Sequence, residues 1–186
     1  TLAKIKLLQN QNLWRDVKIA SGQNIEIDLN GKEIYVQYLY QAKTIENNGD
    51  IKVVDSSNGK QGRIKNYAPG SGITTYGIYN NGTGTAELAS GTIDVAVENG
   101  RSSGLYNATT GAIVLSGGTI YTNANIYAQG LHDFGKGGST KITGGKVYSS
   151  STGLLVENSN TTLIFESGEI GAISVAMNIP STMTRN

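Results

Sequence analysis

The chain has 186 residues and a formal net charge of +1, from 15 lysines and arginines against 14 aspartates and glutamates. This near balance gives no reason to expect nucleic acid or an anionic membrane as a partner. Cysteine is absent, which excludes a disulfide framework and a thiolate metal site. No apolar run approaches the roughly 20 residues that cross a bilayer, so no membrane span is expected.

The first 65 residues predict short strands at irregular spacing. KIKLL (4–8) and DVKIA (16–20) have the composition of early edge strands. NIEIDLNGKEI (24–34) predicts strand, turn, strand, and DIKVVDSSNGKQGRI (50–64) repeats this order with an inserted turn. Ile25 and Ile51 are 26 residues apart, as are Glu26 and Lys52. Each pair should therefore lie side by side in neighbouring strands, with the charged pair on the outer face.

The stretch NYAPGSG (66–72) follows these strands and interrupts the pattern. It contains one proline and two glycines. Because both residue types favour turns, we expect a loop that bulges from the body of the fold.

Two short motifs then recur with one period between residues 73 and 171. The motif seen in LSGGTIYT (115–122) returns four times, and its last glycines are Gly91, Gly118, Gly145 and Gly168, with gaps of 27, 27 and 23 residues. The second motif reads GIYN, GLYN, GLHD and GLLV and begins at Gly77, Gly104, Gly130 and Gly153, with gaps of 27, 26 and 23. Two markers that shorten together in the last repeat indicate a repeat architecture.

Three positions of each repeat are always apolar. They are Leu88, Leu115, Ile142 and Phe165; Ile93, Ile120, Val147 and Ile170; and Ile78, Leu105, Leu131 and Leu154. The residues between them alternate with polar types, so each repeat holds about three short strands, as in one coil of a β-solenoid. A leucine-rich repeat would need a helical or asparagine-ladder segment, which we take to be missing. The sequence predicts an all-β parallel solenoid of six or seven coils, with residues 1–186 as a single domain.

The run ASGQNIEIDLNGKEI (20–34), followed by spaced SGGTI and GIYN units, resembles bacterial cell-surface proteins with right-handed parallel β-helix domains of the pectate-lyase-like architecture. This resemblance implies a right-handed coil, an extracellular, cell-surface or cell-wall-attached location, and an adhesin-like role. It also implies that the chain is a fragment of a longer polypeptide. The same architecture serves lyases, hydrolases, tailspikes and ice-binding proteins, so the function must be argued from sites.

An active site on a solenoid requires chemical groups at one offset in neighbouring repeats. Glycoside hydrolases need two carboxyl groups about 5 to 10 Å apart. Asp94 is matched by Tyr121, Tyr148 and Gly171, and no carboxylate stacks on another in the regular repeats. His132 beside Asp133 is interpreted as a surface histidine in a polar column rather than a catalytic dyad. No catalytic residue, metal site or cofactor is predicted. A fragment of a polysaccharide lyase or glycoside hydrolase is the alternative.

Two outward aromatic columns are the candidate contact surfaces. One contains Tyr79, Tyr106 and His132, and the other contains Tyr121 and Tyr148. Rings one coil apart are about 4.8 Å apart and can stack. Such a stripe suits sugar rings, although outward aromatic stacks also stabilise sheets without binding anything. An ice-binding face needs a regular threonine grid, and the column Thr92, Thr119, Lys146, Glu169 breaks halfway.

We therefore expect a non-catalytic extracellular module, a stalk or a scaffold that contacts polysaccharide, host glycan or host protein. Stacked coils expose unpaired backbone at both ends. We expect an open end either to pair with another copy or to be covered by the apolar tail from Ala172 to Ile179.

Overall fold

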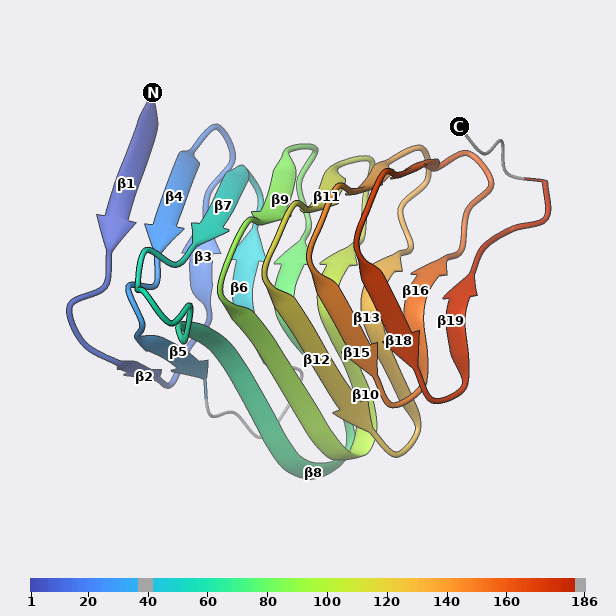
Figure 1. Ribbon diagram of the computed structural model, residues 1–186, viewed down its shortest axis with the longest axis horizontal. Coiled ribbons are helices and arrows are strands. Elements are labelled where there is room, and N and C mark those ends of the chain that lie inside the picture. The colour runs from blue at the N-terminus through green and yellow to red at the C-terminus, as the bar shows by residue number, and fades with distance from the viewer. Residues whose placement is uncertain (37–41, 183–186) are drawn as a thin grey trace.

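The computed structural model describes residues 1–36 and 42–182, and these residues form an all-β solenoid (Figure 1). The chain winds as a coil with three faces, and strands pair in parallel with the coil before and the coil after. The described residues contain no helix, and hence none long and apolar enough to cross a membrane. The predicted parallel β-helix is confirmed.

Each face carries seven strands in the described ranges. Face 1 contains β1 (Leu2–Lys6), β4 (Asn24–Asp28), β7 (Asp50–Val54), β9 (Thr85–Leu88), β11 (Ala112–Leu115), β14 (Ser139–Ile142) and β17 (Thr162–Phe165). Face 2 contains β2 (Gln11–Leu13), β5 (Glu33–Val36), the first halves of β8 (Arg63–Asn80) and β10 (Thr92–Asn107), β12 (Thr119–Ala124), β15 (Lys146–Ser149) and β18 (Glu169–Ala172). Face 3 contains β3 (Val17–Ile19), β6 (Ala42–Asn47), the second halves of β8 and β10, β13 (Tyr127–Asp133), β16 (Thr152–Val156) and β19 (Val175–Asn178).

The pairing register follows the period read from the sequence. Ile93 pairs with Ile120 and Leu105 with Leu131, one coil apart. In the first coils Glu26 pairs with Lys52, as predicted. Because inward positions recur at one offset, their apolar side chains form continuous columns that fill the interior.

The interior column of face 1 differs from the prediction at one end. Leu88, Leu115 and Ile142 are fully buried, whereas Phe165 is 42% exposed. Phe165 pairs with Ile142 in the expected register. It is exposed because β17 is the last strand of its sheet in the described range, so no further coil covers its ring.

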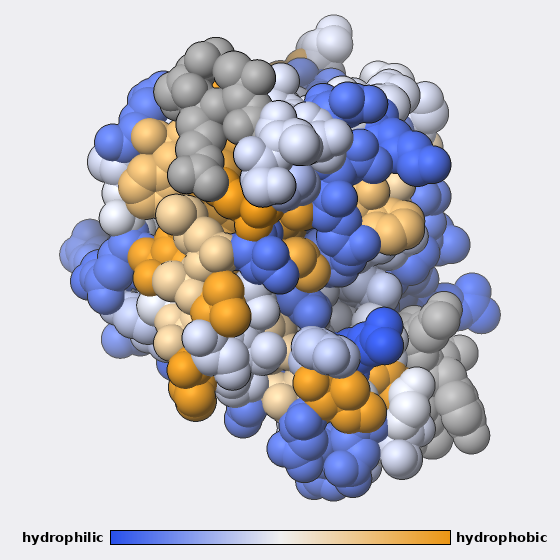
Figure 2. All heavy atoms as spheres, turned by 90° about the vertical axis from the view of Figure 1, so that its right-hand side faces the viewer, coloured by the Kyte–Doolittle hydropathy of each residue, from blue (hydrophilic) through white to orange (hydrophobic). Residues whose placement is uncertain are grey.

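The tail does not fold across the end of the stack. Residues 169–172 form β18 and residues 175–178 form β19, which extend faces 2 and 3 by one more strand each. Ile179 alone packs against the core from beyond β19. Apolar side chains remain exposed at this end (Figure 2), among them Ile173, Val175 and Met177.

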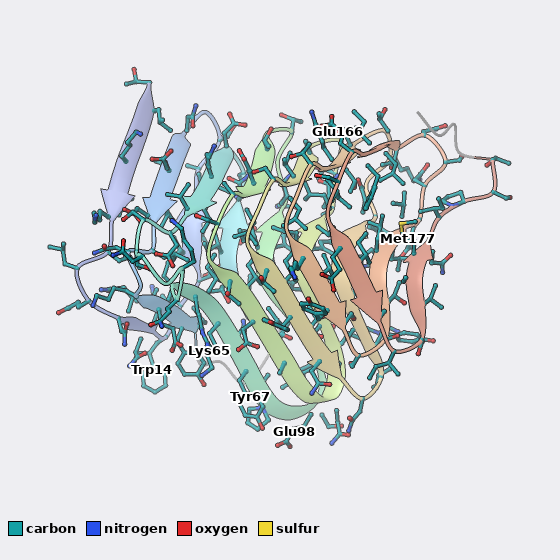
Figure 3. All side chains as sticks on the ribbon, viewed as in Figure 1. Trp14, Lys65, Tyr67, Glu98, Glu166 and Met177 are labelled. Carbon is teal, nitrogen blue, oxygen red and sulfur yellow. The ribbon has the colours of Figure 1, made fainter. Side chains whose placement is uncertain are left out.

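Residues 66–72 do not form a loop outside the coil, because β8 runs through them from face 2 to face 3. Ala68 pairs with Val97 and Ile73 with Gly100, so β8 has two more residues than β10 at this bend. The extra residues are absorbed as a bulge, which bends a strand locally. Next to the bend the Tyr67 hydroxyl donates to Glu98 at 2.6 Å, on the lower edge of the molecule in Figure 3.

A buried amide ladder, which the sequence analysis took to be missing, runs along the corner after face 3. Asn47 donates to Asn80 at 2.7 Å, Asn80 to Asn107 at 3.2 Å, and Asn107 to Asp133 at 3.1 Å. Each asparagine also donates to a turn carbonyl of its own coil, for example Asn107 to Gly111 at 2.9 Å. All four side chains are fully buried, so the ladder satisfies backbone groups that the tight corner hides from water.

A glycine column on face 3 sets which side chains point outward. A Cβ atom on Gly77, Gly104, Gly130 or Gly153 would overlap a branched side chain of face 2 in the next coil. In β8 both Gly77 and the following Ile78 are buried, so the normal alternation breaks at this pair. As a result Tyr76 and Tyr79, three residues apart, both lie on the outer side of face 3.

Candidate functional site

The five aromatic and histidine residues predicted from the sequence lie in two separate groups. Tyr79, Tyr106 and His132 pair across neighbouring coils of face 3. Tyr121 and Tyr148 pair on face 2. The structure does not bring the two groups together, and each has a different environment.

The face 3 column is a continuous ring stack. The rings of Tyr79 and Tyr106 are parallel within 17°, with centroids 5.0 Å apart. His132 meets Tyr106 edge-on, with centroids 4.8 Å apart and an interplanar angle of 89°. Both geometries are favourable for aromatic pairs.

Two further rings, which the sequence analysis did not select, complete this cluster. Tyr76 contacts both neighbouring rings edge-on, at 4.9 Å from Tyr79 and 5.0 Å from Tyr106. Phe134 lies in the turn after β13, and its ring is parallel to Tyr106 within 16° at 6.5 Å. Tyr76 was missed because its own column continues with Ser103 and Gln129, which are not aromatic.

Four members of the cluster, Tyr76, Tyr106, His132 and Phe134, line a cleft of about 310 Å³ on the outside of face 3, whereas Tyr79 lies outside this lining. The cleft is lined by Thr74, Tyr76, Arg101, Ser103, Tyr106, Tyr127, Gln129, His132, Phe134, Leu155 and Glu157. It combines aromatic surface with a few polar groups, which is the usual composition of a small-molecule site.

His132 is paired with Glu157 and not with Asp133. Its Nε2 lies 2.8 Å from Glu157 Oε1, which belongs to the turn one coil further along. Asp133 points inward and ends the amide ladder, so no His132–Asp133 dyad exists. Burial lowers the pKa of His132, and the Glu157 carboxylate opposes this shift. The His132 side chain is therefore predominantly neutral at neutral pH.

The phenols of Tyr76 and Tyr106 remain protonated over the physiological range. Burial raises the pKa of Tyr76 to about 12, and it raises the pKa of Tyr106 as well. Both hydroxyls are therefore neutral groups that donate and accept hydrogen bonds.

Arg101 and Tyr127 stand on the side of the cleft formed by neighbouring residues of β10 and β13. The Arg101 guanidinium lies 5.5 Å from the centroid of the Tyr127 ring, within the range of a cation–π contact. Both side chains are exposed. Neither was selected from the sequence, because their column with Thr74 is chemically mixed.

The two tyrosines of face 2, Tyr121 and Tyr148, line a shallower hollow. Tyr121 and Tyr148 are parallel within 18°, with centroids 5.3 Å apart, beside a hollow of about 510 Å³. The Tyr148 hydroxyl donates to Glu169 at 3.1 Å, and Lys146 pairs with the same carboxylate at 3.1 Å. These hydrogen bonds, first that of Lys146 and then that of Tyr148, lower the pKa of Glu169. The polar contacts tie Tyr148 to its own sheet.

Carboxylates do not cluster in the described part of the chain. Asp94 pairs with Tyr121 in register, as the repeat arithmetic predicts. The described residues contain no group of three or more histidine, aspartate or glutamate side chains placed to hold a metal ion. In the lining of the face 3 cleft, Glu157 is the single carboxylate among those residues.

The chain matches no protein-family model, no curated protein and no solved structure. A parallel β-helix by itself does not specify an activity, because one fold carries many functions. Function therefore has to be argued from the side chains of the face 3 cleft and the two tyrosine columns.

Proposed function

We propose that this protein is a non-catalytic, extracellular cell-surface module that binds glycan in the cleft of face 3. The observation that carries the proposal is the gathering of Tyr76, Tyr106 and Phe134 along one wall of that cleft. Flat aromatic faces pack against the apolar faces of sugar rings, and phenol hydroxyls bond to sugar hydroxyls. The resemblance to bacterial adhesin-like β-helix proteins supports the same role.

The solenoid suits this task because it holds the cleft rigidly. Tyr76 and Tyr106 stand on β8 and β10, which pair with each other, and Phe134 directly follows β13, which pairs with β10. Side chains on paired strands are positioned more accurately than side chains on loops. The same stack of coils supplies the stiff scaffold of a surface stalk.

Binding to immobilised glycans tests the proposal. We expect the protein to be retained by a subset of a glycan array. Tyr106→Ala should lower the affinity at least about tenfold, because packing of one aromatic ring against a ligand contributes a binding free energy of about that size. Tyr121→Ala is the matched control, since it removes an outward tyrosine from face 2 and should bind normally. Equal binding by all three proteins, or no binding by any, would refute a glycan site in this cleft.

A carbohydrate-active enzyme is the second candidate, and the His132–Glu157 pair in the same cleft favours it. A positioned histidine beside a carboxylate can transfer protons. The usual glycosidase mechanism requires two carboxyl groups, and Glu157 is the single one among the described lining residues. Screening polysaccharides for new reducing ends or unsaturated products, with Glu157→Gln as control, separates the two candidates. Products formed by the wild type and lost in the variant would favour the enzyme.

A further inference from the structure

Several outward cations of this solenoid face a carboxylate. Lys4 pairs with Glu26 at 3.0 Å on face 1, and Lys52 and Lys141 have equivalent partners in later coils. On face 2, Lys146 is paired in the same way. Such pairs neutralise the outer surface locally. Several described cations have no such partner, and among them Arg101 is the one that lines the cleft of face 3.

Arg101 lacks such a partner within the part of the chain that the structure describes. Its guanidinium carbon lies 5.5 Å from the centroid of the Tyr127 ring, a contact that orients the guanidinium without neutralising it. Arg101 nevertheless lines the cleft, together with Tyr76 and His132. Burial raises the pKa of Tyr76 to about 12 and lowers that of His132, and the positive charge of Arg101 acts to lower both. The positive charge of Arg101 therefore acts on both Tyr76 and His132 in the cleft.

The one carboxylate in the described lining is already engaged. The Glu157 carboxylate accepts a hydrogen bond from His132 Nε2 at 2.8 Å and makes no ion pair with Arg101. With His132 predominantly neutral, the Glu157 charge is held by its hydrogen bond on one side of the cleft. The Arg101 guanidinium, which has no carboxylate partner among the described residues, remains available to a ligand.

We infer that the ligand of this cleft is an acidic glycan, and that Arg101 binds the carboxylate of a uronate residue. This inference rests on the proposed glycan-binding function and specifies its ligand class. The planar guanidinium matches a carboxylate with two parallel hydrogen bonds, a fit that a neutral sugar does not offer. Ser103 donates to Gln129 Oε1 at 3.2 Å, which leaves the Gln129 amide nitrogen to bond sugar hydroxyls. The ring of the same sugar packs on the wall of Tyr106 and Phe134.

Calorimetric titration with matched ligands tests this inference. The probes are oligoglucuronate, oligomannuronate and oligogalacturonate, each beside its carboxyl-reduced, neutral counterpart of equal length. We expect at least one uronate to bind at least about tenfold more tightly than its neutral counterpart, which is the usual size of a charge-assisted hydrogen-bond contribution. Arg101→Gln should abolish that preference. Arg101→Lys should retain only part of it, because lysine keeps the charge and loses the planar fork.

The outcomes separate the two proposals. If Tyr106→Ala abolishes binding but charged and neutral oligosaccharides bind equally, with Arg101→Gln unaffected, the glycan site stands and the acidic-ligand inference fails. If the preference for uronates persists undiminished in Arg101→Gln, a different cation carries it and the inference also fails. If the wild type binds none of the probes and nothing on the glycan array, both fall. Arg101 is exposed, so these substitutions should leave the folded state intact, which a circular dichroism melt checks.

Discussion

Single buried polar residues decide how tightly successive coils are joined. Asn107 shows this most clearly, because its one amide nitrogen lies within hydrogen-bond distance of Thr109 O, Gly111 O and Asp133 Oδ1, at 3.1, 2.9 and 3.1 Å. Its carbonyl oxygen accepts from Asn80 in the coil before. One side chain therefore satisfies groups in its own coil and in both neighbours.

Asn107→Ala should lower the free energy of unfolding by about 3 kcal/mol, because it leaves several buried groups without partners. Urea denaturation followed by circular dichroism measures the change. Asn160→Ala is the matched control, since Asn160 is exposed in a turn, and it should stay within about 0.5 kcal/mol of the wild type. Similar losses in both variants would contradict the role given to the ladder.

Asp133 makes the end of the ladder sensitive to pH. Burial raises the pKa of this carboxyl above its ordinary value of 3.8, although hydrogen bonds from Thr140, Asn107 and Gly135 oppose the shift. The folded state therefore holds the proton to higher pH than the unfolded state does, and the ionised carboxylate lowers stability above the folded-state pKa. That loss is regained as the pH falls through the folded-state pKa towards 3.8.

Asp133→Asn should consequently be at least as stable as the wild type at pH 7, with an advantage that shrinks as the pH falls towards 4. An amide at this position also continues the asparagine ladder with a group that never ionises. Unfolding free energies of both proteins at several pH values provide the test, because all other titrations cancel in their difference. A difference that is constant with pH would show that Asp133 is not the titrating group.

Among the strands, the glycine column of face 3 governs how closely faces 2 and 3 approach. A methyl group on Gly104 would overlap the Ile120 side chain and would lie 2.6 Å from Gly130 O in the next coil. Neither neighbour can withdraw, because both belong to paired strands. The second sequence marker is therefore a packing requirement.

Gly104→Ala should destabilise the fold by about 2 kcal/mol, as expected for overpacking of a dense interior. Gly171→Ala serves as its control, because a methyl group there would meet no atom closer than 3.3 Å, at the edge of the Tyr148 ring. We expect the control to melt within a few degrees of the wild type. If Gly171→Ala were the more damaging change in a thermal melt, the packing interpretation would be wrong.

The same column explains how far sequence reasoning reaches. The period predicts the pairing of strands and the columns of Leu105 and Ile120, because stacked coils repeat one offset. It does not reveal that Gly130 and Leu131 both face inward. Asp133 follows Leu131 by two residues and therefore also faces inward, where it ends the asparagine ladder that the repeat pattern alone did not indicate. The cleft was not predicted either, since its arginine and its phenylalanine belong to no uniform column.

At the scale of the whole molecule, stability is a sum of contacts between neighbouring coils. Each coil touches the coil before and the coil after, and the interior columns run through the middle of the stack. A defect in a central coil therefore separates two shorter stacks, each of which has lost a neighbour.

Leu115→Asp should unfold the middle of the solenoid. Leu115 is fully buried between Leu88 and Ile142, and a carboxylate there would have no polar partner above or below. Hydrogen exchange should show loss of protection spreading outward from β11, with the melting temperature well below that of the wild type. A variant that melts within a degree or two of its parent would contradict the position of Leu115 in the core.

We expect glycan to bind in the cleft of face 3 and on no other surface of the protein. A crystal structure of the protein soaked with the tightest-binding oligosaccharide from the array would locate the ligand. We predict a sugar ring against Tyr106 and Phe134, with a carboxylate at the guanidinium of Arg101. An oligosaccharide bound instead along Tyr121 and Tyr148 on face 2, or at an end of the stack with the face 3 cleft unoccupied, would show that the cleft is not the glycan site.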